Sequence, residues 1–262
     1  MGISFTGLRA AMKATMGVVF PPQCPGCGAV VAEDGGLCAE CWRDTEFIGP
    51  CACGRCGAPV PGDGAPVRDE AALLCDDCLV IDRPWRRGRA AVVYAGTGRR
   101  LALALKHGDR VDLAPVLGQW VGRAAAPLVR PGMLVVPVPV HPRRLMARKY
   151  NQAALLSAQV ARMHGLRHMP GALIRTRHTP MQDHGSVGDR VGNVAGALAV
   201  PARSRACIEG RAILLVDDVM ASGATLAAAT AALREAGSGP VAVAVLARAV
   251  KTPGRAADEP EE

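Results

Sequence analysis

Aromatic residues are scarce in this chain: three Trp, two Tyr and three Phe make up 3% of its 262 residues. Half of the residues are nevertheless hydrophobic, so a folded core has to be built mainly from Ala, Val and Leu. Proteins that bind single-stranded nucleic acids usually stack the bases on aromatic rings. The scarcity of aromatics therefore weakens, without excluding, a single-strand binding function.

Long apolar runs are also missing. No stretch reaches the roughly 20 residues that a helix needs to span a bilayer, so we expect no transmembrane segment. Residues 1–20 have the pattern of an amphipathic helix, which we expect to pack on the protein itself rather than on a membrane. This stretch contains Arg9 and Lys13 and ends in prolines instead of a small-residue cleavage site, which is unlike a secretory signal.

The ten cysteines are unevenly placed, because nine of them lie between positions 24 and 78. Eight of these nine form four C-x-x-C pairs. Pairs at these separations are typical of zinc sites with four thiolate ligands, which have no open coordination position and are structural. A disulfide framework is the alternative, but it needs an oxidising compartment. We predict two structural Zn²⁺ sites with the ligands Cys24, Cys27, Cys38, Cys41, Cys53, Cys56, Cys75 and Cys78.

The formal net charge is +8, and it is unevenly distributed. Arginines crowd residues 83–100 and 143–148, whereas residues 251–262 end in a run of acids that we expect to be disordered. A basic balance suits a pyrophosphate-containing substrate, and it equally suits nucleic acid. Charge alone does not decide between these partners.

Strand and helix patterns alternate after the cysteine-rich region. Short apolar runs predict buried strands, and the longer amphipathic stretches between them predict helices. This alternation is typical of an α/β fold in which helices flank a mostly parallel sheet. We predict strands at 90–94, 133–138, 213–216 and 241–246, and helices at 99–106, 112–128, 151–163 and 226–235.

Composition divides the chain into four parts. A helical lead-in at 1–20 precedes a cysteine-rich module at 21–82. An α/β domain follows at 83–250, and an acidic tail occupies 251–262. We place the main boundary near residue 82 because the cysteine pairs stop there and the apolar periodicity begins.

One apolar run ends in two adjacent acids, Asp217 and Asp218, and a turn of small residues follows at 221–225. Small residues let a ligand approach the main chain, and the start of the next helix offers N–H groups for a phosphate. Carboxylates accept hydrogen bonds from ribose hydroxyls, so the segment suits a sugar phosphate. It has neither the lysine of a Walker A loop nor the spacing of G-x-G-x-x-G. The alternative is an ordinary strand, turn and helix with a solvated acid pair.

A proline-rich connection with two arginines follows the strand expected at 133–138. Prolines stiffen such a connection, and arginines are planar donors for phosphate oxygens. Lys106, at the end of an expected helix, could bring another cation to the same oxygens. The alternatives are a rigid loop with solvated arginines and a charged helix end that the helix dipole favours.

The acid pair and its turn closely resemble the phosphoribosyl-pyrophosphate (PRPP) loop of type I phosphoribosyltransferases. The resemblance implies that PRPP arrives with Mg²⁺ and that Asp217 and Asp218, at the catalytic centre, bind the 2′- and 3′-hydroxyls of its ribose. It implies that the 5′-phosphate binds Ala221, Ser222, Gly223, Ala224 and Thr225. The pyrophosphate would bind Val138, Pro139, Val140, His141 and Arg143, with Lys106 as a further cation.

The whole chain resembles the ComF family, in which a double zinc ribbon precedes a phosphoribosyltransferase-like domain. Besides the cysteines and the acid loop, the resemblance rests on residues 138–144, Tyr150-Asn151-Gln152 and Thr179-Pro180-Met181-Gln182. Gly185 is a departure, because the family usually has leucine there. The resemblance implies a bacterial cytoplasmic protein linked to competence and DNA uptake.

Two functions are compatible with this resemblance. The first is a PRPP-binding, phosphoribosyltransferase-like protein that transfers or binds a 5-phosphoribosyl group with release of pyrophosphate. The alternative is a non-catalytic zinc-ribbon adaptor that binds single-stranded DNA or a DNA-processing partner.

Overall fold

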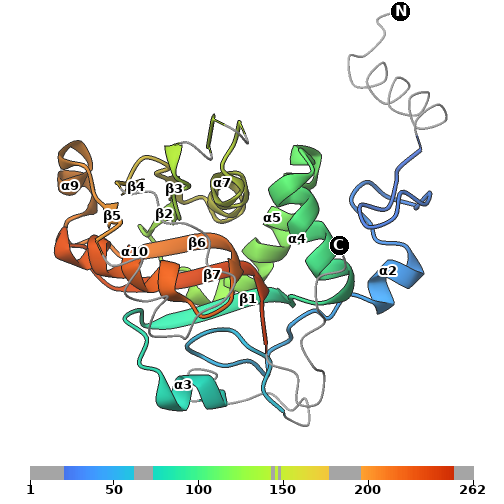
Figure 1. The fold of residues 1–262 in the computed structure, drawn as a ribbon, viewed down its shortest axis with the longest axis horizontal. Helices are drawn as coiled ribbons and strands as arrows, with labels where there is room; N and C mark the ends of the chain where they lie inside the picture. Colours follow the sequence, from blue (N-terminus) through green and yellow to red (C-terminus); the bar gives the residue numbers. More distant parts are fainter. Residues whose placement is uncertain (1–20, 62–72, 143–144, 147–148, 177–195, 251–262) are drawn as a thin grey trace, which may run out of the picture.

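A parallel sheet forms the centre of the molecule, as the computed structural model in Figure 1 shows. The structure describes residues 21–61, 73–142, 145–146, 149–176 and 196–250. The five strands lie in the order β1-β7-β6-β2-β3, and every neighbouring pair is parallel. The predicted α/β class with a mostly parallel sheet is confirmed. The strands are β1 Arg87–Val93, β2 Leu134–Pro137, β3 Arg167–His168, β6 Ile213–Met220 and β7 Val241–Arg248, and β4 Ile174–Arg175 pairs antiparallel with β5 Leu198–Ala199.

The helices fall close to the predicted positions, with one division. The stretch predicted as a single helix at 112–128 consists of the 3₁₀ turn η1, the helix α5 and the 3₁₀ turn η2. Pro115 near the start of α5 and Pro127 in η2 explain this, since proline has no N–H to continue an α-helical ladder. The described helical elements are α2 Ala39–Arg43, α3 Asp76–Val80, α4 Gly96–His107, η1 Val111–Leu113, α5 Ala114–Ala125, η2 Ala126–Leu128, α7 Gln152–His164, α9 Ala202–Ile208 and α10 Ala224–Glu235.

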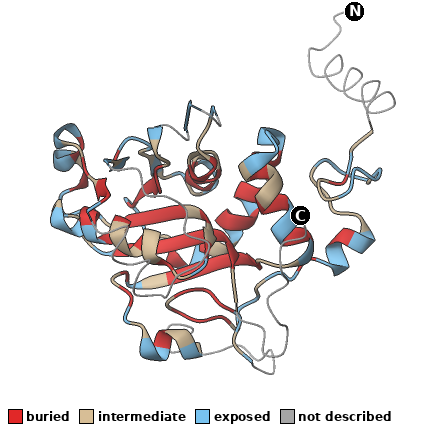
Figure 2. Ribbon diagram, viewed as in Figure 1, coloured by how far each residue is buried: buried red, intermediate tan, exposed pale blue. Residues whose placement is uncertain are grey.

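The sheet is buried on both faces, as the red strands in Figure 2 show. Successive residues of a strand point to opposite faces, so β6 contributes Leu214 and Val216 to one core cluster and Ile213 and Leu215 to the other. The first cluster includes buried residues of α4, α5 and α7. The second includes residues of α10 together with the cysteines Cys53, Cys56 and Cys78. The second cysteine group, which consists of Cys53, Cys56, Cys75 and Cys78, therefore covers part of the sheet where another helix would otherwise have to lie.

Close backbone contacts fix the second cysteine group against β1. The Gly88 N–H donates to the Gly54 carbonyl at 2.9 Å, and Trp85 Nε1 donates to the Arg55 carbonyl at 2.6 Å. A Cβ at Gly57 would lie 2.4 Å from the Ala90 nitrogen, so no larger residue fits there. The first cysteine group, which consists of Cys24, Cys27, Cys38 and Cys41, instead lies beside α4. Asp44, which ends the helix α2 that carries Cys41, accepts from the Thr97 hydroxyl at 2.8 Å.

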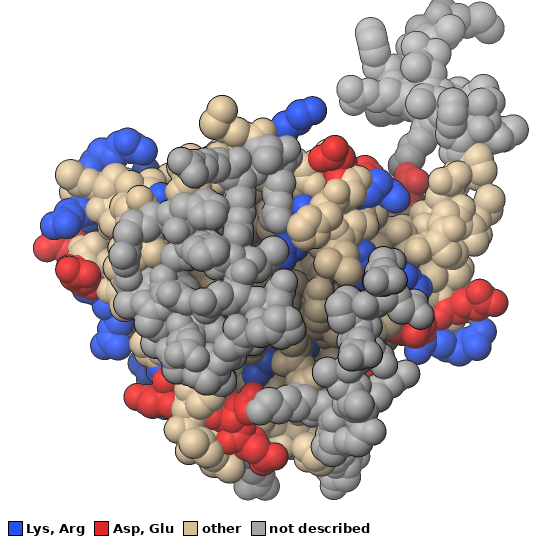
Figure 3. Space-filling view, viewed as in Figure 1, with Lys and Arg blue, Asp and Glu red and all other residues tan. Residues whose placement is uncertain are grey.

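Charge is distributed unevenly over the surface seen in Figure 3. Basic and acidic side chains both lie around its margin, and a large acidic group lies toward the lower end, the region of α3 in Figure 1. The first turn of α3 carries Asp76 and Asp77.

The predicted helix at 1–20, the predicted tail at 251–262 and the predicted ligand Arg143 lie outside the described residues. Within the described residues, no helix is long and apolar enough to cross a membrane.

Candidate functional site

The eight predicted zinc ligands come together in two groups of four. Cys24, Cys27, Cys38 and Cys41 form one group and Cys53, Cys56, Cys75 and Cys78 the other, with all sulfurs of a group within 4.8 Å of one another. The Cys27 and Cys38 sulfurs are 3.6 Å apart, and those of Cys56 and Cys75 are 3.5 Å apart. Sulfurs around a tetrahedral zinc lie about 3.8 Å apart, given a Zn–S bond of about 2.3 Å, so both groups fit the metal.

The ten cysteines are all free, so the alternative of a disulfide framework is not what the structure contains. A side-chain hydrogen bond with Cys56 lowers the pKa of the Cys53 thiol to about 4. Thiolates are the form that binds zinc. Cys51 lies outside both groups, as the spacing predicts.

Asp217 and Asp218 lie within β6 rather than after it. The strand continues past its predicted end at residue 216 because β7 pairs with it as far as Met220. The other neighbour, β2, ends at Pro137 opposite Val216. The two acids therefore project at the carboxyl edge of the sheet, which is where open α/β folds bind ligands.

A buried glutamine positions the second acid. Gln152, at the start of α7, donates from Nε2 to Asp218 Oδ2 at 3.1 Å. The other oxygen of Asp218 accepts from the Val219 N–H at 2.9 Å. Asn151 caps α7 by accepting from the N–H of Ala153, and its amide donates to the Val138 carbonyl at 3.0 Å. The motif Tyr150-Asn151-Gln152 thus joins the acid pair to the predicted pyrophosphate segment.

The environment of Asp217 disfavours the ionised form of its carboxyl group. Burial, and then the adjacent Asp218 carboxylate, raise the pKa of Asp217 well above its ordinary value. The charge of Lys106, in the last turn of α4, acts in the opposite direction. A carboxyl that is costly to ionise alone becomes easier to ionise when a ligand brings hydroxyl donors or a cation.

The loop after β6 turns into α10 at Gly223, whose φ of +82° suits glycine. Ser222 Oγ accepts from the Ala224 N–H, and the first intrahelical bond runs from the Ala227 N–H to the Gly223 carbonyl. The N–H groups of Thr225 and Leu226 precede that bond and have no partner within the helix. Such groups at a helix start form a binding site for a phosphate.

The predicted pyrophosphate segment begins beside the acids. The Val138 N–H donates to the Val216 carbonyl at 2.9 Å, directly before Asp217 in β6. Pro139 is buried, and Val140 and His141 are half-buried. Tyr150 donates its hydroxyl to the Leu105 carbonyl at 2.8 Å, which ties this connection to the turn of α4 that carries Lys106. The structure therefore brings Lys106 and residues 138–141 to the same edge as the acids.

Two further residues at the loop carry no sequence motif that assigns them a role. Arg83 and Arg248 are 6% and 1% exposed, and both donate to carbonyls of residues 220–222. The one signal in the sequence is the position of Arg248 at the end of the apolar run 241–247, where a charged residue needs partners. Gln152 belongs to the motif Tyr150-Asn151-Gln152, which the sequence shows. Its contact with Asp218 could not be inferred from the sequence, because the two residues are 66 positions apart.

Comparison with known proteins matches both parts of the chain. Residues 15–79 match the double zinc ribbon domain, and residues 176–260, which include the acid loop, match the phosphoribosyl transferase domain. The chain is 29% identical over 219 residues to the DNA utilization protein YhgH of Escherichia coli, covering 81% of this chain and 90% of the relative. It is 28% identical over 219 residues to Competence protein F of Haemophilus influenzae, covering 82% and 91%.

Among solved structures, the allosteric regulatory enzyme of purine biosynthesis is similar over 55% of this chain and 30% of its own. The identity is 20% and the TM-score is 0.38, so this likeness supports no argument about the site.

Proposed function

Because the chain belongs to the ComF family, we propose that it binds Mg²⁺-PRPP at the acid pair and transfers the 5-phosphoribosyl group with release of pyrophosphate. One observation carries this proposal. Asp217 and Asp218 lie at the carboxyl edge of the sheet, next to a loop that leads into the N-terminus of α10. Acceptors for ribose hydroxyls and donors for a phosphate are therefore adjacent.

Each group has a distinct role in this proposal. The carboxylates of Asp217 and Asp218 accept from the 2′- and 3′-hydroxyls, and the N–H groups of Gly223, Thr225 and Leu226 bind the 5′-phosphate. Lys106 and residues 138–141 bind the pyrophosphate. Mg²⁺, when bound with the substrate, neutralises charge on the departing pyrophosphate.

The transfer itself exchanges one bond at C1 of the ribose. The bond between C1 and the pyrophosphate oxygen breaks, and the pyrophosphate leaves with the electron pair. A nitrogen nucleophile then donates its lone pair to C1 and loses a proton to solvent. The negative charge of Asp217 and Asp218 stabilises the positive charge that develops on the ribose ring.

Isothermal titration of the full-length protein with Mg²⁺-PRPP tests the binding step. We expect saturable binding by the wild type and at least tenfold weaker binding by Asp218→Asn. Asp112→Asn is the control, because Asp112 pairs with Arg110 on the surface at 2.8 Å and lies outside the site. Absence of binding by the wild type, or unchanged binding by Asp218→Asn, contradicts the proposal. Pyrophosphate release in the presence of candidate nitrogen nucleophiles tests turnover separately.

An adaptor function that binds single-stranded DNA is the second candidate, favoured by one aromatic cluster. Phe47 contacts both Trp42 and Trp120: its ring is tilted by 36° to that of Trp42 and meets that of Trp120 edge to face, with centroids 4.8 and 4.9 Å apart. They line a cavity of about 380 Å³ that also contains Arg123. Trp42 is 58% exposed, so a base can reach its ring. Three of the chain's eight aromatics are thus concentrated at one surface.

Fluorescence anisotropy with a labelled single-stranded oligonucleotide tests this candidate. We expect Trp42→Ala to weaken binding several-fold, because stacking contributes about 1–3 kcal/mol per base. Leu79→Ala, which alters an exposed apolar residue on α3, is the control. Absent binding, or equal binding by the two variants, counts against the adaptor.

A further inference from the structure

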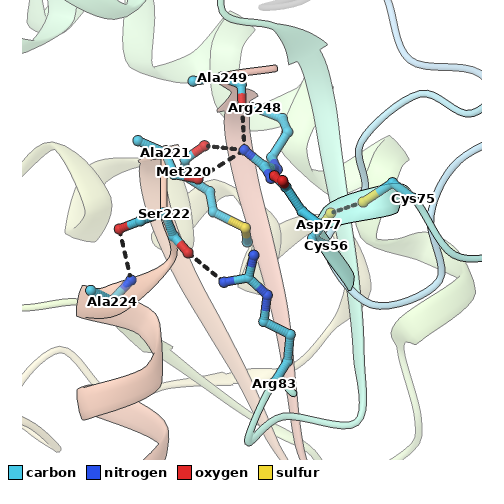
Figure 4. A network of polar contacts seen from close by, with 10 residues as sticks. All are labelled: Cys56, Cys75, Asp77, Arg83, Met220, Ala221, Ser222, Ala224, Arg248 and Ala249. Carbon is cyan, nitrogen blue, oxygen red and sulfur yellow. Dashed lines mark hydrogen bonds and ion pairs between the residues drawn. The ribbon is translucent and has the colours of Figure 1, made fainter. Parts of the chain in front are cut away.

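Arg83 and Arg248 are buried between two functional parts of the molecule. Their exposed fractions are 6% and 1%, although a guanidinium is costly to bury without acceptors and opposite charge. Arg83 lies just after the second cysteine group, and Arg248 ends β7. Figure 4 shows both side chains reaching the loop between β6 and α10.

One side of each arginine contacts carbonyls of this loop. Arg248 Nη1 donates to the carbonyls of Met220 at 3.2 Å and Ala221 at 2.8 Å, and also to that of Ala249. Arg83 Nη1 donates to the Ser222 carbonyl (Figure 4). Three consecutive carbonyls, those of residues 220 to 222, are therefore held by two arginines.

Holding these carbonyls also orients the N–H groups. In a trans peptide the C=O and the N–H of one unit point in opposite directions. Each carbonyl that points toward an arginine thus directs the next N–H away from it. The N–H of Gly223, which belongs to the same peptide unit as the Ser222 carbonyl, therefore faces away from Arg83.

Each arginine is also tied to the second cysteine group. The Arg83 carbonyl accepts from Arg55 Nη1 at 3.4 Å, and Arg55 stands between the ligands Cys53 and Cys56. Arg248 Nη2 also lies 3.4 Å from Asp77, which stands between the ligands Cys75 and Cys78. Four thiolates and one Zn²⁺ carry two negative charges in excess, which two guanidinium groups balance.

We propose that Arg83 and Arg248 are positioning residues that couple the second zinc site to the ligand loop. The charge of the thiolates holds both guanidinium groups, and these hold carbonyls 220–222 so that the intervening N–H groups face a ligand. Zinc in this site then governs the shape of the loop between β6 and α10. The identity of the ligand as PRPP rests on the proposed function, whereas the coupling between metal and loop does not.

Variants of Arg248 test the coupling in the full-length protein. We expect Arg248→Met to weaken Mg²⁺-PRPP binding at least tenfold and Arg248→Lys to restore part of it, since lysine keeps the charge but not the fork of donors. Arg89→Met is the matched control, because Arg89 is also buried (5% exposed) in a strand and lies outside the network. Equal binding by Arg248→Met and the wild type overturns the proposal.

Zinc release provides a second readout that does not depend on catalysis. Coupling is reciprocal, so a ligand that fits the ordered loop must slow the loss of zinc from the second site. We expect Mg²⁺-PRPP to slow the release of one of two zinc ions to a chelator at least fivefold, and this slowing to be smaller in Arg248→Lys, which keeps the charge but not the fork of donors. The coupling is overturned if Mg²⁺-PRPP slows the release of both zinc ions equally. It is also overturned if the protein binds PRPP and the release of neither ion is slowed.

Hydrogen exchange separates the coupling from the proposed function. We expect the amides of residues 221–226 to exchange at least tenfold faster in Cys78→Ser than in the wild type, and to be unchanged in Cys27→Ser, which affects the first site. This comparison needs no PRPP. If the wild type fails to bind PRPP and the difference between the variants is present, the proposed function fails and the coupling stands. If exchange is the same in both variants, the coupling fails.

Discussion

Asp217 places a carboxyl group where burial and the neighbouring Asp218 both oppose its ionisation. Both accept hydrogen bonds: Asp218 from Gln152 and from the Val219 N–H, and Asp217 from the Asp218 N–H at 2.9 Å. The pKa of Asp217 is nevertheless raised, by burial and by Asp218. The free protein thus stores unfavourable electrostatic energy at the position where we propose that the ribose binds.

Replacing Asp217 with asparagine should stabilise the free protein and weaken ligand binding. Because the folded-state pKa is raised, the fold holds a proton that the unfolded chain has released, and stability falls as pH rises from about 4 through the folded pKa. Calorimetry should therefore give Asp217→Asn a midpoint a few degrees above the wild type at pH 8, with a smaller gap at pH 5.

Asp112 provides a control with the opposite sign. Hydrogen bonding to Arg110 lowers the pKa of Asp112, so its charge stabilises the fold and this stability is lost as pH falls through the lowered value. Asp112→Asn should give a slightly lower midpoint at pH 8. A wild-type midpoint equal to or above that of Asp217→Asn at pH 8 refutes the electrostatic explanation.

At the scale of elements, the segment from β6 through the loop to α10 was predictable in kind but not in its bounds. The apolar run 213–216 and the alanine-rich helix are local patterns, and both were predicted. The continuation of β6 to Met220 depends on its ladder with β7, which no local pattern contains. The contacts of Gln152 with Asp218, and of Arg83 with Ser222, join residues far apart in sequence, so spacing could not reveal them.

Gly223 should tolerate no side chain, for two separable reasons. Its φ of +82° costs about 1–2 kcal/mol for any L-residue with a Cβ. A Cβ there would also lie 2.6 Å from Arg83 Nη1 and 3.1 Å from the Trp85 ring. We expect Gly223→Ala to lower the free energy of unfolding by more than the backbone cost alone, as measured by urea denaturation.

Gly132→Ala separates the two contributions to this loss. Gly132 has a similar φ of +76°, but a Cβ there would meet nothing within 4 Å. Its substitution should therefore cost only the backbone part, about 1–2 kcal/mol. If Gly223→Ala and Gly132→Ala lose equal stability, the contact with Arg83 contributes nothing.

At the scale of the whole molecule, the two zinc ribbons differ in how far they are buried against the sheet. Cys53 and Cys56 are 0% exposed and belong to the core cluster of the sheet. Cys27 is exposed, and the first group lies beside α4. The sequence predicted that these cysteines form two groups of four, but it gave no sign of this difference, because a glycine follows the second cysteine of the first pair in both groups (Gly28 and Gly57). Burial against the sheet is a tertiary property.

Loss of zinc from the two sites should accordingly have unequal effects. We expect Cys53→Ser to lower the midpoint of the main thermal transition strongly, because its site packs on the sheet. Cys27→Ser should leave that transition within a few degrees of the wild type. Calorimetry together with zinc analysis, with one ion lost in each variant, makes the comparison. Equal midpoints for the two variants contradict the structural difference.

The cover that the second ribbon gives to the sheet also limits how the polypeptide can be cut. A fragment beginning at residue 83 would leave Ile213, Leu215 and Val243 partly uncovered, and it would lack Arg55 and Asp77, which contact Arg83 and Arg248. Such a fragment invites aggregation rather than independent folding. Anyone trimming or fusing this polypeptide would do better to cut before Glu46, whose carbonyl accepts from the Val93 N–H at the margin of the sheet.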